Sequence, residues 1–329
     1  MQNQSEYDVV AVGDIVIDCF IKMNIGHVEE GARGSEYCIP FGSKIPYEDA
    51  IVIPAVGNSP NAAVSSSRIG AKTALISYVG KDRHGQDCID QLKAEGVSTE
   101  LIKEEVGKNT NYHYALWFKD DRTILIKHEA FSYEFPDIGK TKWLYLSSLG
   151  EHAMGLHDHI LKYLEKNPDT KLAFQPGTYQ LELYKQLEVF YKRADIICMN
   201  KEEAQGLLDT DSHDEKELLD GLHKINNGTV IITDGEKGCF LKYDGVYLYM
   251  PIYPDATPPF ERTGAGDAFF STFVAYMAKG FDEKHAIQRA PINSMSVVHK
   301  VGAQAGLLKG DEIEELLKKA PEDYKLKEI

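Results

Sequence analysis

The sequence predicts an α/β protein in which a mostly parallel sheet lies between two layers of helices, a three-layer α/β/α sandwich. Short apolar runs alternate with segments of helical spacing along most of the chain. The apolar runs are continuous, as expected for strands that are buried on both faces of a parallel sheet. The 329 residues are 43% hydrophobic, which is ample for one large core. We therefore expect a single domain that spans residues 1–329.

The first half of the chain begins with a buried strand and continues with helices and strands in alternation. Asn58, Ser59 and Pro60 favour a helix start immediately after them. The expected elements are a strand at 7–13, a helix at 61–69, a strand at 73–79, a helix at 87–94, a strand at 143–147 and a helix at 155–166.

The second half keeps the same alternation, which favours parallel strands joined by helical crossovers. Its expected elements are a strand at 172–174, a helix at 181–192, a strand at 196–199, helices at 201–208 and 215–226, a strand at 230–233, and helices at 268–278 and 287–299. The helix at 268–278 is apolar on all sides, which predicts a helix buried in the core.

Two segments, at approximately 21–53 and 110–128, interrupt this alternation. The first contains several glycines and prolines and no good helix. The second indicates two strands around a turn at 119–122. We interpret both segments as extra strands that stand off the main sheet and form a small β-strand lid; ordinary surface hairpins are the alternative.

Composition excludes several classes of protein. The formal net charge is −15 without a Lys/Arg-rich run, so we expect no nucleic acid partner. No apolar run reaches the ~18 residues of a membrane span. The five cysteines are scattered and form no Cys-x-x-Cys pair, so neither structural disulfides nor a zinc site is expected. This pattern fits the reducing cytoplasm.

The stretch from Arg262 to Asp267 indicates an anion-binding helix start. Gly264, Ala265 and Gly266 carry little side chain, so their backbone N–H groups can point at one anion on the positive end of the helix dipole. The carboxylate of Asp267 follows directly and is suited to take a proton from a hydroxyl that attacks a phosphoryl group. The alternative is a glycine turn whose aspartate only favours the helix dipole.

Further motifs lie along the chain in a fixed order. They are Gly13–Asp18, Val56–Ala63, Tyr78–Gly85, Asn200–Glu203, Thr233–Gly238 and Gly264–Asp267. Together they resemble the PfkB-type carbohydrate kinases, the ribokinase-like family, over nearly the whole chain. The resemblance implies an ATP-dependent kinase that transfers the γ-phosphoryl group to a hydroxyl of a sugar.

The resemblance also implies roles for individual residues on the acceptor side. Asp267 would be the catalytic base, beside the anion hole of Gly264, Ala265 and Gly266. The acceptor would be held by Asp18, Gly57 and Asn61. Asp18 follows a strand, where ligands bind in open α/β sheets. Taken alone, Asp18 could equally be a loop residue and Asn61 a helix cap.

On the nucleotide side, the residues implied by the resemblance are Asn200, Thr233, Gly235, Gly238 and Asn293. Asn293 would lie on the helix beside the adenine. Asn200 and Glu203 offer oxygen atoms that suit Mg²⁺ held through its waters. The same two residues would also form a capping box at a helix start, so both interpretations stay open.

The sequence departs from the family pattern in two places. Glu261-Arg262 stands where the signature usually has Asp-Thr, and Val56 precedes Gly57 where a glycine pair is usual. The implied cofactors are ATP and Mg²⁺. The departures leave open the fine geometry of the acceptor site and a monovalent-cation site near Glu261.

Three alternatives for the function remain at this point. The acceptor could be a nucleoside, as in adenosine-type kinases, or a sugar phosphate. A sugar-binding regulator without turnover is an alternative of another class. Four aromatic residues near the lid could stack on a purine or pack the lid: Phe20, Phe41, Tyr112 and Tyr114. A small-molecule sugar or nucleoside is the expected partner, and a homodimer through the lid is left open.

Overall fold

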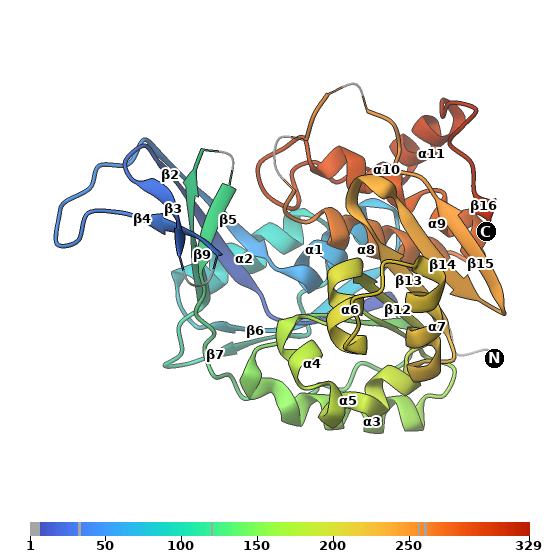
Figure 1. Ribbon diagram of the computed structural model, residues 1–329. Helices are drawn as coiled ribbons and strands as arrows, with labels where there is room; N and C mark the ends of the chain where they lie inside the picture. The colour runs from blue at the N-terminus through green and yellow to red at the C-terminus, as the bar shows by residue number, and fades with distance from the viewer. Residues whose placement is uncertain (1–6, 32–33, 120, 256, 260–261) are drawn as a thin grey trace.

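The computed structural model describes residues 7–31, 34–119, 121–255, 257–259 and 262–329. Its main sheet has the strand order β16-β15-β14-β13-β12-β11-β10-β1-β6-β7 (Figure 1). The strands are β1 Tyr7–Val12, β6 Thr73–Gly80, β7 Ile102–Glu105, β10 Thr141–Leu146, β11 Lys171–Phe174, β12 Ile196–Asn200, β13 Thr229–Thr233, β14 Cys239–Tyr243, β15 Val246–Met250 and β16 Lys327–Glu328. All pairs from β13 to β7 are parallel, whereas β14, β15 and β16 pair antiparallel.

Helices cover both faces of this sheet and bury two separate apolar clusters. One face carries α1 Asn58–Arg68, α2 Arg83–Ala94, α8 Ala265–Ala278, α9 Glu283–Ile287, α10 Ala290–Val297 and α11 Gly310–Lys318. The other carries α3 Met154–Lys166, α4 Thr178–Glu182, α5 Tyr184–Arg193, α6 Lys201–Leu208 and α7 Glu215–Ile225. The predicted three-layer α/β/α sandwich is thus confirmed.

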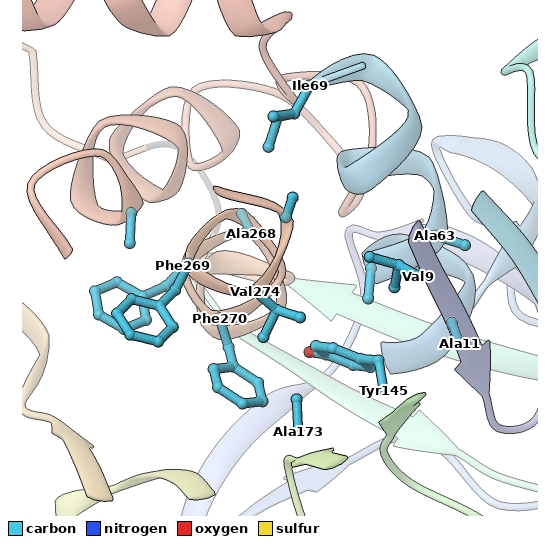
Figure 2. Close-up of a cluster of buried hydrophobic side chains, with 14 of the residues drawn as sticks. Val9, Ala11, Ala63, Ile69, Tyr145, Ala173, Ala268, Phe269, Phe270 and Val274 are labelled. Atoms are coloured by element: carbon cyan, nitrogen blue, oxygen red, sulfur yellow. The ribbon is translucent and has the colours of Figure 1, made fainter. Parts of the chain in front are cut away.

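Helix α8 lies at the centre of the larger cluster. Eleven of its fourteen residues are buried, as its all-apolar sequence predicted. Figure 2 shows Phe269, Phe270 and Val274 of α8 together with Tyr145 of β10. The rings of Tyr145 and Phe270 lie 5.2 Å apart between helix and sheet. Burial of such side chains stabilises the fold by about 1.5–3 kcal/mol each, so the start of α8 is held firmly in place.

Both predicted lid segments form strands outside the main sheet. A four-stranded sheet has the order β5-β2-β8-β9, and a separate hairpin joins β3 to β4. The strands are β2 Val16–Met23, β3 His27–Gly31, β4 Gly34–Cys38, β5 Asp49–Val56, β8 Asn111–Phe118 and β9 Asp121–Leu125. The chain passes from β1 into β2 with only residues 13–15 between them, so the lid begins at the edge of the main sheet.

Some elements differ from the sequence prediction. The expected helix at 287–299 is shorter in the structure: it corresponds to α10, and the separate helix α9 ends at Ile287. Pro291 lacks the N–H that a continuing helix needs and lies in the first turn of α10. The expected helix at 181–192 is divided into α4 and α5. In the described part of the chain, no helix combines the length and apolar character that crossing a bilayer requires.

Candidate active site

A cavity of about 630 Å³ opens at the carboxyl ends of the parallel strands, under the lid. Open α/β sheets bind ligands at this edge. The lining combines strand-end residues, the start of α8 and side chains of the lid. It includes Asp14, Asp18, Gly57, Asn58, Asn61, His113, Arg122, His128, Gln175, Tyr179, Asn200, Glu203, Thr233, Gly264, Gly266 and Asp267. Most of the predicted site residues therefore meet in one place.

The carboxylate of Asp267 accepts hydrogen bonds from three side-chain amides. Asn58 Nδ2 donates to Oδ1 over 2.8 Å, and Asn61 Nδ2 donates to Oδ2 over 2.8 Å. Gln175 Nε2 donates to Oδ1 over 3.2 Å. An ionised carboxylate only accepts hydrogen bonds, so this set of donors favours the charged form. Asp267 is therefore held in the state and orientation that a base requires.

Burial acts on Asp267 in the opposite sense. It disfavours the charged carboxylate and raises the pKa of Asp267 above its ordinary value, although the three amide donors counteract it. A carboxylate with a raised pKa is a stronger base than an exposed one. The three donors orient the Asp267 carboxylate, and burial increases its affinity for a proton, as a candidate base requires.

The start of α8 has the form of an anion hole. Gly264 has a φ of 80° and caps the helix without a side-chain hydrogen bond. A Cβ atom at Gly264 would lie 2.4 Å from the Cβ atom of Ala303, so only glycine fits. The first helical bond runs from Ala268 N to Gly264 O over 2.8 Å. The amides of Gly266 and Asp267 precede that bond and point out of the helix end.

The lid adds a cation next to this hole. Arg122 of β9 donates a hydrogen bond to Thr263 Oγ1, one residue before Gly264. Both residues line the cavity. The contact ties the outer strand of the lid to the start of α8 and brings a guanidinium group close to the place where an anion would bind.

Asp18 lies on the lid side of the cavity. It is the third residue of β2, whereas the sequence analysis placed it just after a strand of the main sheet. His113 Nδ1 lies 3.7 Å from Asp18 Oδ1. Burial, with a smaller effect of His128, lowers the pKa of His113 to about 4 although Asp14 opposes the shift. His113 is therefore neutral at neutral pH and can act as a hydrogen-bond partner for a ligand.

Asp14 places another carboxylate in the same cavity. It accepts a hydrogen bond from Gly150 N over 2.8 Å and one from the hydroxyl of Tyr133 over 3.2 Å. His128 Nδ1 lies 3.5 Å from Asp14 Oδ2. Two carboxylates and two histidines thus stand together where the main sheet meets the lid.

Gly57 and Asn61 line the cavity, and both also have a structural role. Gly57 has a φ of 120°, and a Cβ atom there would lie 2.7 Å from the carbonyl oxygen of Asp14. Asn61 donates to Asp267, and its Oδ1 accepts a hydrogen bond from Gln304 Nε2 over 3.0 Å. Asn61 therefore orients the carboxylate of Asp267, a role that the sequence analysis did not assign.

Asn200 and Glu203 form a capping box, which was one of the two interpretations given by the sequence analysis. Asn200 Oδ1 accepts from Glu203 N over 2.8 Å, and Glu203 Oε2 accepts from Asn200 N over 2.9 Å. Both residues also line the cavity. Burial raises the pKa of Glu203, with smaller effects of Glu202 and Asp267. The cap leaves Glu203 Oε1 available, so a second role is sterically open.

Thr233 lines the cavity, whereas Gly235 and Gly238 lie in the adjoining turn between β13 and β14. A Cβ atom at Gly238 would lie 2.4 Å from the carbonyl oxygen of Met250, which explains this glycine by close backbone approach. Asp234 in the same turn lies 3.2 Å from the Nζ atom of the buried Lys201. The turn is therefore fixed beside the strand end that carries Thr233.

Asn293 has a structural role. The structure does not bring it to the cavity but buries it completely between helices. Its Nδ2 donates to Thr272 Oγ1 over 2.8 Å and to Ser65 Oγ over 3.3 Å. Its Oδ1 accepts from Leu308 N over 2.9 Å. The structure thus gives Asn293 a role in joining α1, α8 and α10, and the expected contact with adenine stays a prediction.

The structure adds functional candidates that the sequence analysis missed. Asp14, Gln175 and Asn58 could have been found, since the first two follow strands of the main sheet and the third lies within a quoted motif. His113, His128 and Arg122 come from the lid and its neighbourhood, and no spacing in the sequence points to them. Glu261, near which a monovalent cation was considered, lies outside the described residues.

Comparison with known proteins decides the family. The model of the pfkB family of carbohydrate kinases matches residues 8–310. The chain belongs to this family. It is accordingly a phosphotransferase with an alcohol group as acceptor, of the sugar and nucleoside kinase type.

Individual relatives are distant. A 5-dehydro-2-deoxygluconokinase of Halalkalibacterium halodurans is 24% identical over 339 aligned positions, which cover 97% of each protein. A nucleoside kinase of Methanocaldococcus jannaschii, an archaeal member of the ribokinase family, superposes with a TM-score of 0.78 at 21% identity, covering 95% of this chain and 98% of that one. A putative ribokinase II of E. coli in complex with ATP and Mg²⁺ has a TM-score of 0.78 at 20% identity, with 94% and 99% coverage. At such identities these two structures establish the fold of this pfkB kinase.

Replacement of Asn293 tests whether its side chain supports the fold or contacts the nucleotide. In Asn293→Ala, the loss of three buried hydrogen-bond contacts should lower the free energy of unfolding by about 1–3 kcal/mol. The KM for ATP should change less than ~3-fold, because the side chain does not reach the cavity. Denaturant unfolding and steady-state kinetics measure the two effects. A rise of KM above ~10-fold with unchanged stability would place Asn293 at the nucleotide site.

Proposed function

We propose that this pfkB kinase transfers the γ-phosphoryl group of ATP to a hydroxyl of a sugar. One observation carries the proposal: the buried carboxylate of Asp267 is held by three amides beside the uncapped start of α8, in the cavity that also contains Asp18. A base, an anion hole and a hydroxyl-binding carboxylate are the parts that phosphoryl transfer to an alcohol needs.

In the proposed reaction, the acceptor oxygen forms a bond to the γ-phosphorus while the bond from that phosphorus to the bridging oxygen breaks, which releases ADP. The acceptor proton passes to Asp267. The amides of Gly266 and Asp267 stabilise charge on the transferred group, whereas Ala265 N donates to the carbonyl oxygen of Arg262 over 3.4 Å. Loss of one such donor typically costs ~10²–10³ in rate. Arg122 stands beside the same place through its bond to Thr263.

The nucleotide side is proposed to consist of Asn200, Thr233 and the turn with Gly235 and Gly238. Asn200 and Glu203 fit a magnesium ion because they place hard oxygen donors on the cavity wall, and one oxygen of Glu203 is not used by the helix cap. They would hold the ion through its waters. When bound, Mg²⁺ supplies neutralisation of phosphate charge.

The acceptor side favours a sugar over a nucleoside. Asp14, Asp18 and the neutral His113 offer hydrogen-bond partners for hydroxyl groups. None of the four aromatic residues considered for purine stacking, Phe20, Phe41, Tyr112 and Tyr114, is among the described cavity-lining residues. We propose that acceptor binding draws the lid over the cavity and excludes water from the reaction.

We also propose that two copies can pair through the lid. Its strands leave Val28, Ile51, Val52, Tyr114 and Leu125 exposed, and exposed apolar patches are typical of association surfaces. Sedimentation equilibrium tests this proposal: a mass that remains at 36.8 kDa at every concentration would contradict it.

We further propose the cytoplasm as the site of action. All five cysteines are free, and four of them are buried. Unpaired thiols are typical of reducing compartments. Fractionation of the source cells, followed by detection of the protein with an antibody, tests this; recovery outside the cytoplasmic fraction would contradict it.

The central test measures ADP release with a panel of sugars, sugar acids, nucleosides and sugar phosphates. We expect turnover with a sugar or sugar acid, and a loss of at least ~10² in turnover for Asp267→Asn with circular dichroism unchanged. A nucleoside or sugar phosphate as the best acceptor would replace the proposed substrate class. Acceptor binding without ADP release would favour the regulator, and near-normal turnover of the variant would remove Asp267 as base.

A second prediction separates the two roles of Glu203. Glu203→Gln should raise the Mg²⁺ concentration for half-maximal rate, because a hard carboxylate near the phosphates is lost. Glu312→Gln is the matched control, since Glu312 occupies the same capping-box position in α11, where Lys309 N donates to its carboxylate over 2.7 Å. If both variants only lose thermal stability and keep the same Mg²⁺ dependence, Glu203 is a helix cap alone.

A third prediction concerns Asp18. Asp18→Ala should weaken acceptor binding by about 10- to 100-fold and ATP binding little, since a hydrogen bond to a charged group contributes about 1.5–3 kcal/mol. Calorimetric titration of each ligand measures this. Asp90→Ala, which changes an exposed carboxylate of α2, is the control. Equal losses for both ligands, or none, would place Asp18 outside the acceptor site.

A further inference from the structure

The hairpin of β3 and β4, within the first lid segment, carries a group of potential metal ligands. His27 and Cys38 are direct cross-strand partners, and Glu29 follows two residues after His27. Side chains alternate between the two faces of a strand, so these three lie on the same face of the hairpin. Their potential ligand atoms all lie within 4.8 Å of one another.

The distances suit a small tetrahedral metal site. His27 Nε2 lies 3.4 Å from Glu29 Oε2, and Cys38 Sγ lies 3.4 Å from Glu29 Oε1. Two ligands bound to one zinc ion at the usual lengths are separated by roughly 3.5 Å. A small rotation of the Glu29 carboxylate or of the imidazole would therefore bring all three groups onto one ion.

Charge around the thiol favours a cation. The Cys38 thiol donates a hydrogen bond to the Glu29 carboxylate over 3.4 Å, and Glu36 adds a second carboxylate on the same face of the hairpin. The same negative field attracts a divalent cation, which in turn stabilises the thiolate. A half-buried cysteine on a short hairpin is also unusual, since free cysteines are mostly fully buried.

The opposite face of the hairpin packs against the four-stranded sheet of the lid. The ring of Tyr37 stacks on Phe118 of β8 with centroids 4.8 Å apart, and its hydroxyl donates to the carbonyl oxygen of Ile25 over 2.5 Å. All residues of β3 are exposed, so the ligand face is open to solvent. A two-stranded hairpin alone is marginally stable, and an ion bridging both strands would fasten it.

We propose that His27, Glu29 and Cys38 form a binding site for a zinc-type divalent metal ion on the lid. The imidazole nitrogen, one carboxylate oxygen and the thiolate sulphur are the three protein ligands, with water at the fourth position. The thiol proton is released to solvent as the metal–sulphur bond forms. The sequence analysis expected no zinc site, because the ligands come together only through the register of the hairpin.

Cobalt titration of the full chain tests the site directly. Equimolar Co²⁺ should give the near-ultraviolet charge-transfer absorption of a cobalt–thiolate bond, and Zn²⁺ should abolish it by displacement. Cys38→Ser should remove the band and weaken Zn²⁺ binding at least ~10-fold. His285→Ala is the matched control, since His285 is an exposed histidine 2.6 Å from the Asp282 carboxylate with no cysteine in its group.

Thiol alkylation gives a second measurement that does not depend on folding of the variant. Cys38 is the cysteine that is not buried, so it should react first in the native protein. One equivalent of Zn²⁺ should slow its alkylation at least ~10-fold while ADP release in the presence of Mg²⁺ continues. Equal alkylation rates with and without Zn²⁺, or a cobalt band that persists in Cys38→Ser, would overturn the proposal.

Discussion

The structure depends on the buried carboxylate of Asp267 at the start of a buried helix. A charge in such a place is costly unless it is fully hydrogen-bonded. Asn58, Asn61 and Gln175 supply the donors; the first two come from α1 and the third directly follows β11. One interaction therefore fixes the helix start, the first crossover helix and the strand edge relative to one another, and all three belong to the site.

This arrangement explains why α8 is apolar on every side. The helix start that we propose as an anion site must remain fixed, and packing against Tyr145, α1 and α10 provides that rigidity. Asn293 belongs to the same support, because its amide joins the three helices behind the cavity. Asn293 thus supports the neighbouring site through the helices that it joins.

The lid consists of two small sheets with different chemistry. The four-stranded sheet presents Asp18, His113 and Arg122 to the cavity, which adds polar groups that the main sheet alone does not supply. The separate hairpin of β3 and β4 gathers His27, Glu29 and Cys38. Because the two groups lie in different sheets, the chemistry of one does not restrict that of the other.

The sequence by itself determined the layers and most of the strands and helices, because periodicity acts over a few residues. Its local glycine motif also predicted the anion hole and the base, and both stay proposals. It also predicted that Asn200 and Thr233 meet at one edge, since parallel strands end together. Asp18 instead reaches the cavity from β2 of the lid, and Asn61 from α1. Only the tertiary structure decided that Asn61 orients Asp267, that Asn293 is buried, and that His113 and Arg122 enter the cavity from the lid. The hairpin ligands likewise meet only through cross-strand register. These outcomes depend on contacts between segments distant in the sequence, which no local pattern encodes.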